Sequence, residues 1–121
     1  MSMACHRAAI EIFDEAGMDR LVAKSKNLTD YMEFIIDDIL QKNRKQGLID
    51  MITPRDANQR GCQLSLLINK NGKKVHQFFT DNGVIADWRE PDVIRVAPVP
   101  LYNTFEDVYH FGEILEQAIN L

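Results

Sequence analysis

Apolar residues recur at helical spacing in two consecutive segments at the start of the chain. In residues 3–16 they are separated by acidic residues, and Gly17 follows, a residue type that ends helices because it tolerates left-handed backbone. From residue 18 to about residue 45 the apolar positions again follow a helical period, at Leu21, Leu28, Tyr31, Ile35 and Ile39. The pattern predicts a helix over 3–16 and a longer one over 18–45, which ends before Gly47.

Beyond Gly47 the spacing changes to that of short strands. Four segments are apolar or alternate between apolar and polar residues, as strands do: 49–53, 61–69, 84–88 and 93–97. A helical pattern over 73–82 separates the second from the third. Pro98 and Pro100 end the last strand, since proline has no N–H for sheet pairing.

The clearest element is the last helix. Thr104 is followed three residues later by Asp107, which is a capping-box signature. An apolar stripe then runs along one side, through Val108, Phe111, Leu115 and Ala118.

The order of the elements favours the α+β class, with an antiparallel or mixed sheet whose helices pack on one face. The length suits one domain over 1–121, made of the long helix 18–45 and of sheet and helices over 49–119. The chain begins within helical periodicity, as expected of a segment that belongs to a longer protein.

Composition narrows the function classes. A hydrophobic fraction of 45% and a charged fraction of 26% are ordinary for a soluble domain, and a net charge of −4 does not suggest nucleic-acid binding. The longest apolar runs are far shorter than the roughly 20 residues that span a bilayer, and no signal peptide is recognised. We therefore expect no nucleic-acid and no membrane partner.

The two cysteines show neither metal-ligand spacing nor a disulfide framework, so no metal site is expected. Cys62 falls at the start of the apolar segment 61–69, where it is interpreted as a small buried residue. This cysteine usage fits a reducing cytoplasm.

Candidates for catalysis are few. The histidines lie within helical patterns and far apart, at His6, His76 and His110. Acidic pairs at 14–15 and 37–38 suit solvated helix faces, and no zinc-protease, nucleophile-elbow or phosphate-loop motif occurs. We expect no catalytic residue in this chain.

Arg95 is the exception, because it interrupts the apolar strand VIRVAPV. Strand alternation places it on a face with Val93 and Ala97, while Ile94 and Val96 point the other way. Its planar guanidinium could bind a carboxylate through two parallel hydrogen bonds. Alternatively, the strand is an edge strand and Arg95 is solvated or pairs with a nearby carboxylate of Asp87, Glu90 or Asp92. Spacing leaves both interpretations open.

The chain resembles the C-terminal portion of kynureninases. The resemblance is carried by RGCQLSL at 60–66 and by GVIADWREPDVIRVAPVPLYNTFEDVYHF at 83–111, and the segment EIFDEAGMDRLVAKSKNLTDYMEF at 11–34 is similar to the helical lead into that portion. IRVAPVPLYNTFEDV at 94–108 is the most specific part. A looser version of it is shared with class V aminotransferases and cysteine desulfurases.

The resemblance implies the small C-terminal domain of a homodimeric, cytoplasmic, fold-type-I enzyme whose large domain binds pyridoxal phosphate. Such enzymes hydrolyse L-kynurenine, or its 3-hydroxy form, to anthranilate (or 3-hydroxyanthranilate) and L-alanine, in tryptophan catabolism and NAD biosynthesis. The cofactor lysine would lie in that large domain, outside this chain. The 121-residue segment alone is therefore expected to be inactive.

The resemblance also ranks the site residues. Arg95 matches the family arginine that binds the substrate α-carboxylate. Tyr102 and Asn103 are secondary candidates for shaping the site, although Asn103 also suits a helix cap. Arg60 and Gly61 could approach the cofactor domain, or Arg60 could simply end a polar loop.

Two other interpretations remain. One is the small domain of another class V aminotransferase or cysteine desulfurase-like enzyme. Cys62, predicted in a strand and not on a mobile loop, argues against a desulfurase. The other is a free-standing α+β module that binds a ligand such as an amino acid.

Overall fold

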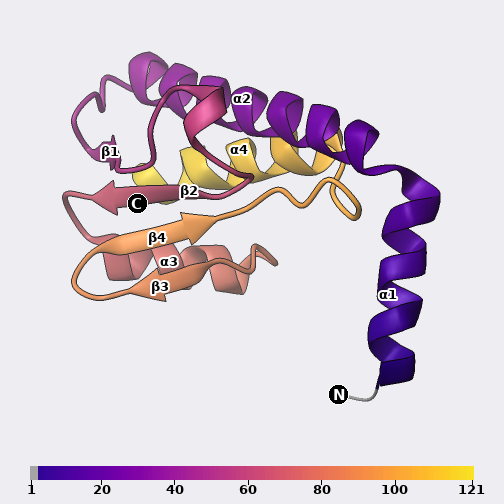
Figure 1. Cartoon of the computed structure of the whole chain (residues 1–121). Coiled ribbons are helices and arrows are strands. Elements are labelled where there is room, and N and C mark those ends of the chain that lie inside the picture. The colour runs from indigo at the N-terminus through magenta and orange to yellow at the C-terminus, as the bar shows by residue number, and fades with distance from the viewer. Residues whose placement is uncertain (1–2) are drawn as a thin grey trace.

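A computed structural model describes residues 3–121, which form four α-helices and one four-stranded sheet (Figure 1). In chain order these elements are α1 Met3–Ala16, α2 Met18–Lys42, β1 Ile49–Met51, the short 3-10 helix η1 Ala57–Gln59, β2 Leu64–Ile68, α3 Gly72–Asp81, β3 Asp87–Arg89, β4 Val93–Val96 and α4 Phe105–Ile119. The predicted order of helices and strands is confirmed.

The sheet is antiparallel throughout, with the strand order β1-β2-β4-β3. Strand β4 is therefore interior, and the interpretation of the predicted strand 93–97 as an edge strand is wrong. The register places Ser65 of β2 and Asp87 of β3 on either side of Arg95. The turn between β3 and β4 contains a cis peptide bond between Glu90 and Pro91.

One face of the sheet is covered by helices and carries the core (Figure 1). Alternate residues of the central strands are buried on this face, at Leu64, Leu66, Ile68, Ile94 and Val96. They pack with the apolar sides of α2, α3 and α4, and the rings of Phe79 and Phe111 meet edge to face at 5.5 Å between centroids. The predicted stripe along α4 is buried as expected.

Helix α1 projects from the start of α2 and away from the sheet (Figure 1). Gly17 joins the two helices with a φ of 86°, a value that suits glycine because it has no Cβ. Apolar side chains of α1 are exposed, among them Ile10, Ile12 and Phe13. Within residues 3–121, no helix combines the length and the apolar character needed to cross a membrane.

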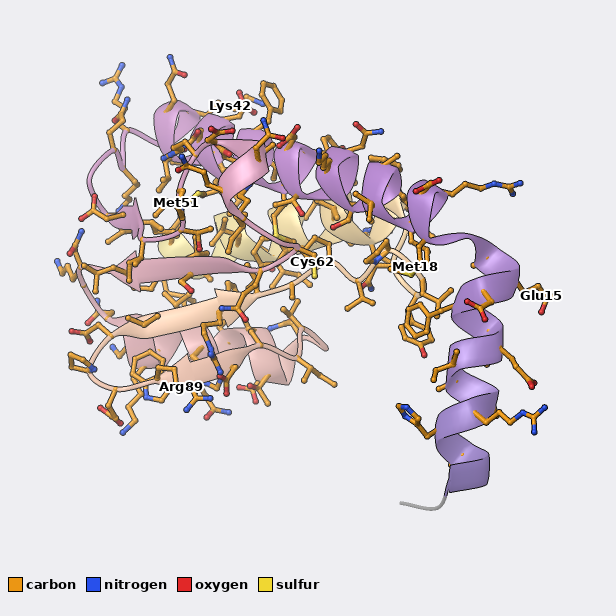
Figure 2. The ribbon with its side chains drawn as sticks, viewed as in Figure 1. Glu15, Met18, Lys42, Met51, Cys62 and Arg89 are labelled. Atoms are coloured by element: carbon orange, nitrogen blue, oxygen red, sulfur yellow. The ribbon has the colours of Figure 1, made fainter. Side chains whose placement is uncertain are left out.

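Two predicted strands begin later than expected, and the register explains both. Extended by two residues, the pairing of β2 with β4 would set Cys62 opposite Pro98, which has no N–H to donate. Cys62 therefore lies in the loop before β2 and is partly exposed, so its prediction as a buried strand residue is wrong (Figure 2). Likewise Val84 would oppose Pro98, and β3 begins only at Asp87. Helix α2 ends at Lys42, before the predicted residue 45.

Candidate functional site

Arg95 lies on the open face of the sheet, opposite to the helices. Its neighbours Ile94 and Val96 are buried in the core, whereas Arg95 and Val93 are partly exposed. The predicted alternation along this strand is confirmed. An arginine on an interior strand thus reaches the uncovered side of the domain.

Asp87 is the partner of Arg95. Arg95 donates from Nε to Asp87 Oδ2 at 2.8 Å, and from Nη2 to the same oxygen. Arg89 on β3, labelled in Figure 2, donates from its own Nε to that oxygen at 2.9 Å. The sequence left three carboxylates as possible partners of Arg95, and the structure shows that the partner is Asp87 and neither Glu90 nor Asp92.

The cluster formed by Asp87, Arg89 and Arg95 carries two positive charges and one negative charge. The hydrogen bond from Arg95, together with that from Arg89 and the charges of both, holds the pKa of the Asp87 carboxyl below its usual value despite some desolvation. Asp87 is therefore ionised at neutral pH, and the cluster keeps a net charge of +1. Such a surface attracts an anion.

Polar groups continue across the sheet on the other side of Arg95. Ser65 stands directly opposite Arg95 on β2, and its Oγ accepts a hydrogen bond from Gln63 Nε2 at 3.2 Å. The Ser65 backbone N–H donates to Thr53 Oγ1 at 2.8 Å. Reasoning from the sequence did not identify Ser65, because only its outward alternation was visible and not the strand beside which it lies.

Asn103 supports the turn that leads into α4. Its Oδ1 accepts from the Val99 backbone N–H at 2.7 Å, and its Nδ2 donates to Asp107 at 3.4 Å. The N-cap of α4 is Thr104, so the interpretation of Asn103 as the helix cap is wrong. Tyr102 is largely exposed, and among the described residues no hydrogen bond joins either residue to Arg95.

A groove of about 500 Å³ lies between α4, the end of β4 and the segment 82–85. Its wall is mainly apolar and includes Asn103 and His110 but not Arg95. The structure therefore does not bring Asn103 and Arg95 into one hollow. His76, on α3, forms a hydrogen bond between its Nε2 and the Ala86 carbonyl oxygen at 2.8 Å, which is a structural role.

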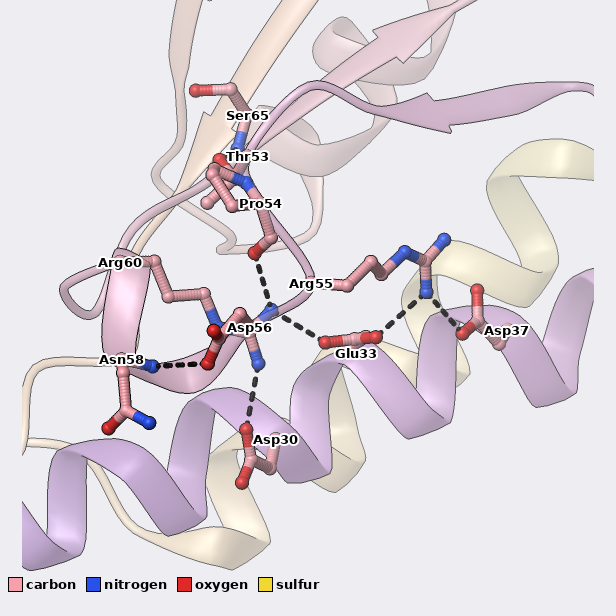
Figure 3. Close-up of polar contacts among 10 residues, drawn as sticks. All are labelled: Asp30, Glu33, Asp37, Thr53, Pro54, Arg55, Asp56, Asn58, Arg60 and Ser65. Atoms are coloured by element: carbon pink, nitrogen blue, oxygen red, sulfur yellow. Dashed lines mark hydrogen bonds and ion pairs between the residues drawn. The ribbon is translucent and has the colours of Figure 1, made fainter.

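Arg60 is buried against helix α2, with only 2% of its side chain exposed (Figure 3). Its Nη2 donates to Asp30 at 2.7 Å, and its Nη1 donates to Glu33 at 2.6 Å and to the Pro54 carbonyl oxygen at 3.3 Å. Arg55 also binds Glu33 at 2.8 Å, so two arginines share that carboxylate. These contacts hold the loop 54–60 on α2.

Burial raises the pKa of the Glu33 carboxyl, but hydrogen bonds from Arg55 and Arg60 outweigh it and leave the pKa below its usual value. The Nε of Arg60 is buried without a partner among the described residues. At Gly61 no atom beyond its two chain neighbours lies within 4 Å of where a Cβ would stand, so no close approach explains that glycine. Neither residue lies in the cluster around Arg95.

No group of histidine, cysteine and acidic side chains within residues 3–121 is arranged to hold a metal ion. Cys62, now seen to lie in a loop, does not by its position argue against a desulfurase. Distinguishing these enzyme families therefore depends on the comparison with known proteins.

Residues 21–115 match the family model described as the kynureninase C-terminal domain. The chain is 42% identical over 119 residues to the kynureninase of Flavobacterium psychrophilum and 43% identical over 119 residues to that of Christiangramia forsetii. Each match covers 98% of this chain and 28% of the relative. The kynureninase of Myxococcus xanthus is 46% identical over 114 residues, which are 94% of this chain and 26% of that relative. The chain thus spans about a quarter of the length of these curated relatives, and it belongs to the kynureninase C-terminal domain family.

Proposed function

We propose that this chain is the small C-terminal domain of a pyridoxal-phosphate-dependent kynureninase. The enzyme would hydrolyse L-kynurenine, or its 3-hydroxy form, to anthranilate (or 3-hydroxyanthranilate) and L-alanine. The family match and the identity of 42–46% along nearly the whole chain support this assignment. The remaining three quarters of such an enzyme would supply the large cofactor domain, and its dimeric assembly in the cytoplasm is part of the same proposal.

Within that enzyme, Arg95 binds the α-carboxylate of the substrate. The observation that carries this role is the position of a partly used guanidinium on the open face of the sheet. The bonds to Asp87 engage Nε and Nη2, and among the described residues Nη1 has no hydrogen-bond partner. A guanidinium with free N–H groups and a net positive surrounding suits a carboxylate.

The contribution of Arg95 is orientation. A bound carboxylate fixes one end of the amino acid and so sets the direction of the bond to be cleaved relative to the cofactor. Pyridoxal phosphate, when bound, supplies the electron sink for that cleavage. Tyr102 and Asn103 are proposed to contribute to the site from the turn before α4, outside the cluster around Arg95.

The described residues fit the substrate side of the site and not the attachment of the cofactor. All seven lysines of the chain lie outside the four strands, on helices or in connecting segments, and none is on the strand that carries Arg95. The proposal therefore assigns the cofactor lysine to the large domain. The segment alone is expected to show no kynurenine hydrolysis.

Replacing Arg95 in the full-length enzyme tests the proposal. We expect Arg95→Ala to lower kcat/KM for L-kynurenine by about 100-fold or more, because a charge-assisted, two-point contact is lost. Arg95→Lys keeps the charge without the planar guanidinium, so its kcat/KM should lie between those of the parent and of Arg95→Ala. Steady-state kinetics on folded, cofactor-loaded protein provide the measurement.

Two controls make the result specific. Arg20→Ala removes the same charge from an exposed position on α2 and should leave kcat/KM unchanged. Inhibition by a kynurenine analogue that lacks the α-carboxylate should be the same in Arg95→Ala and the parent enzyme. An Arg95→Ala enzyme with the parent kcat/KM would exclude the carboxylate role.

A further inference from the structure

We propose that Asp87 is a positioning residue that holds one edge of the Arg95 guanidinium and leaves the opposite end to the substrate carboxylate. The inference rests on the proposed function of Arg95. It adds a residue that touches no substrate and acts only through the arginine. It also explains why an arginine proposed to bind an external carboxylate already has a carboxylate of its own.

The sheet register brings the two side chains together. Asp87 and Arg95 are directly opposed residues of neighbouring antiparallel strands, so their side chains leave the sheet on the same face. Both donors that Arg95 directs at Asp87, Nε and Nη2, lie on one edge of the guanidinium plane, and both reach the same oxygen. Two contacts from one edge fix the direction of the whole plane.

Arg60 in the same chain shows the contrasting arrangement. There both terminal nitrogens are bound, Nη2 by Asp30 and Nη1 by Glu33 and a carbonyl oxygen, and the side chain is 2% exposed. Arg95 is 32% exposed and engages Nε and Nη2. One arginine has its terminal nitrogens used within the fold, whereas the other is held by one edge with a terminal nitrogen to spare.

Arg89 completes the arrangement. It donates to the same oxygen of Asp87, so the carboxylate is held from two sides on the exposed face of the sheet. Because two guanidinium groups share one carboxylate, a net positive charge remains to attract a second carboxylate. Asp87 can therefore orient Arg95 without cancelling its attraction for a ligand.

The kinetic consequence differs from that of losing Arg95. Without Asp87, the guanidinium keeps its charge and still binds a carboxylate, and an internal competitor is removed, so KM should not rise. The plane is no longer fixed, however, and the substrate is held in a wider range of directions. Misalignment of the reacting bond lowers kcat.

The experiment uses the full-length, cofactor-loaded enzyme and compares Asp87→Ala, Asp87→Asn and Asp92→Asn with the parent. For Asp87→Ala we expect kcat for L-kynurenine to fall about tenfold with KM unchanged or lower. Asp87→Asn keeps an oxygen that can accept from Arg95 and should recover most of kcat. Asp92→Asn removes the same charge from the exposed β3–β4 turn and should match the parent.

Each alternative result contradicts the inference. An Asp87→Ala enzyme that matches the Asp92→Asn control shows that Arg95 needs no positioning by this residue. A rise in KM with kcat unchanged shows that Asp87 supports only binding. If Asp87→Ala does not fold, the test uses Asp87→Asn instead. A lower kcat together with a higher KM in Asp87→Asn than in the parent would exclude positioning.

The Arg95→Ala and Asp87→Ala variants together distinguish the carboxylate-binding role of Arg95 from its positioning by Asp87. Arg95→Ala with unchanged kcat/KM would remove the carboxylate role itself, whatever the Asp87 variants do. A large loss in Arg95→Ala beside unchanged kinetics in Asp87→Ala would leave that role intact and remove only the positioning by Asp87.

Discussion

Two arginines of this chain show that the surroundings of a side chain determine its role. Arg60 is enclosed by carboxylates of α2 and a backbone carbonyl oxygen, and it fastens a loop to that helix. Arg95 is anchored at one edge on the open face of the sheet. A buried guanidinium must be paired because it cannot lose its proton, so the role of Arg60 is structural.

Glu33 allows this structural role to be tested. Glu33→Gln should lower the free energy of unfolding by about 2 kcal/mol at pH 7, because Arg60 and Arg55 lose a shared, mostly buried carboxylate. Urea denaturation of the 121-residue chain at several pH values provides the measurement.

The pH dependence has a definite sign. The pKa of Glu33 is lower in the folded chain than in the unfolded one, so its stabilisation is full above the ordinary carboxyl value of about 4.3 and is lost as the pH falls through the folded value. The difference in unfolding free energy between the parent and Glu33→Gln should therefore narrow progressively as the pH falls below about 4.3. Glu15→Gln, at an exposed site on α1, should match the parent, and a gap for Glu33→Gln that does not depend on pH would contradict this account.

At the scale of elements, the start of α4 is determined locally. Thr104 Oγ1 accepts from the Asp107 N–H at 3.1 Å, and Asp107 Oδ2 accepts from the Thr104 N–H at 2.9 Å. The second of these bonds lowers the pKa of Asp107, with further help from Asn103. The helix entrance follows the turn 98–103, so its cap also fixes the chain that leaves β4.

Thr104→Ala should therefore destabilise the chain by about 1 kcal/mol, because helix α4 loses the side-chain oxygen that caps its first turn. Thr104→Ser keeps the hydroxyl and should restore most of the loss. Thermal unfolding followed by circular dichroism measures both. Equal stability of the alanine variant and the parent would show that the cap contributes nothing here.

The elements themselves could be predicted from periodicity, because helical and strand spacings reflect which residues face a common core. The errors occur where strands meet. Residues near Cys62 and Val84 have strand-like sequences, yet both would lie opposite Pro98 and remain unpaired. Local sequence does not show which residue will lie opposite.

At the scale of the whole molecule, the contact of α2 with α4 closes the core around Gly112. A Cβ on Gly112 would stand 2.6 Å from the Cγ2 methyl group of Ile35. Ile35 is β-branched and buried in a helix, so its side chain has little freedom to move aside. This glycine allows the two helices to approach.

Gly112→Ala should therefore destabilise the chain by about 1–2 kcal/mol, although alanine is the better helix former by about 1 kcal/mol. A double-mutant cycle with Ile35→Ala provides the check. The second substitution removes the clashing methyl group, so the double variant should be more stable than the sum of the single effects predicts. Strict additivity would show that the two positions do not collide.

The sequence by itself determined the order of the helices and strands, the cap of α4, the strand face that Arg95 shares with Val93 and, through its motifs, the family. These features depend on residues a few positions apart, or on motifs that can be read directly. Only the tertiary structure decided that Asp87 is the partner of Arg95, that Arg60 is buried on α2, and that Cys62 lies in a loop. The physical reason is that strand register and loop packing join residues distant in the chain, such as Arg60 and Asp30, and no local period encodes such pairs.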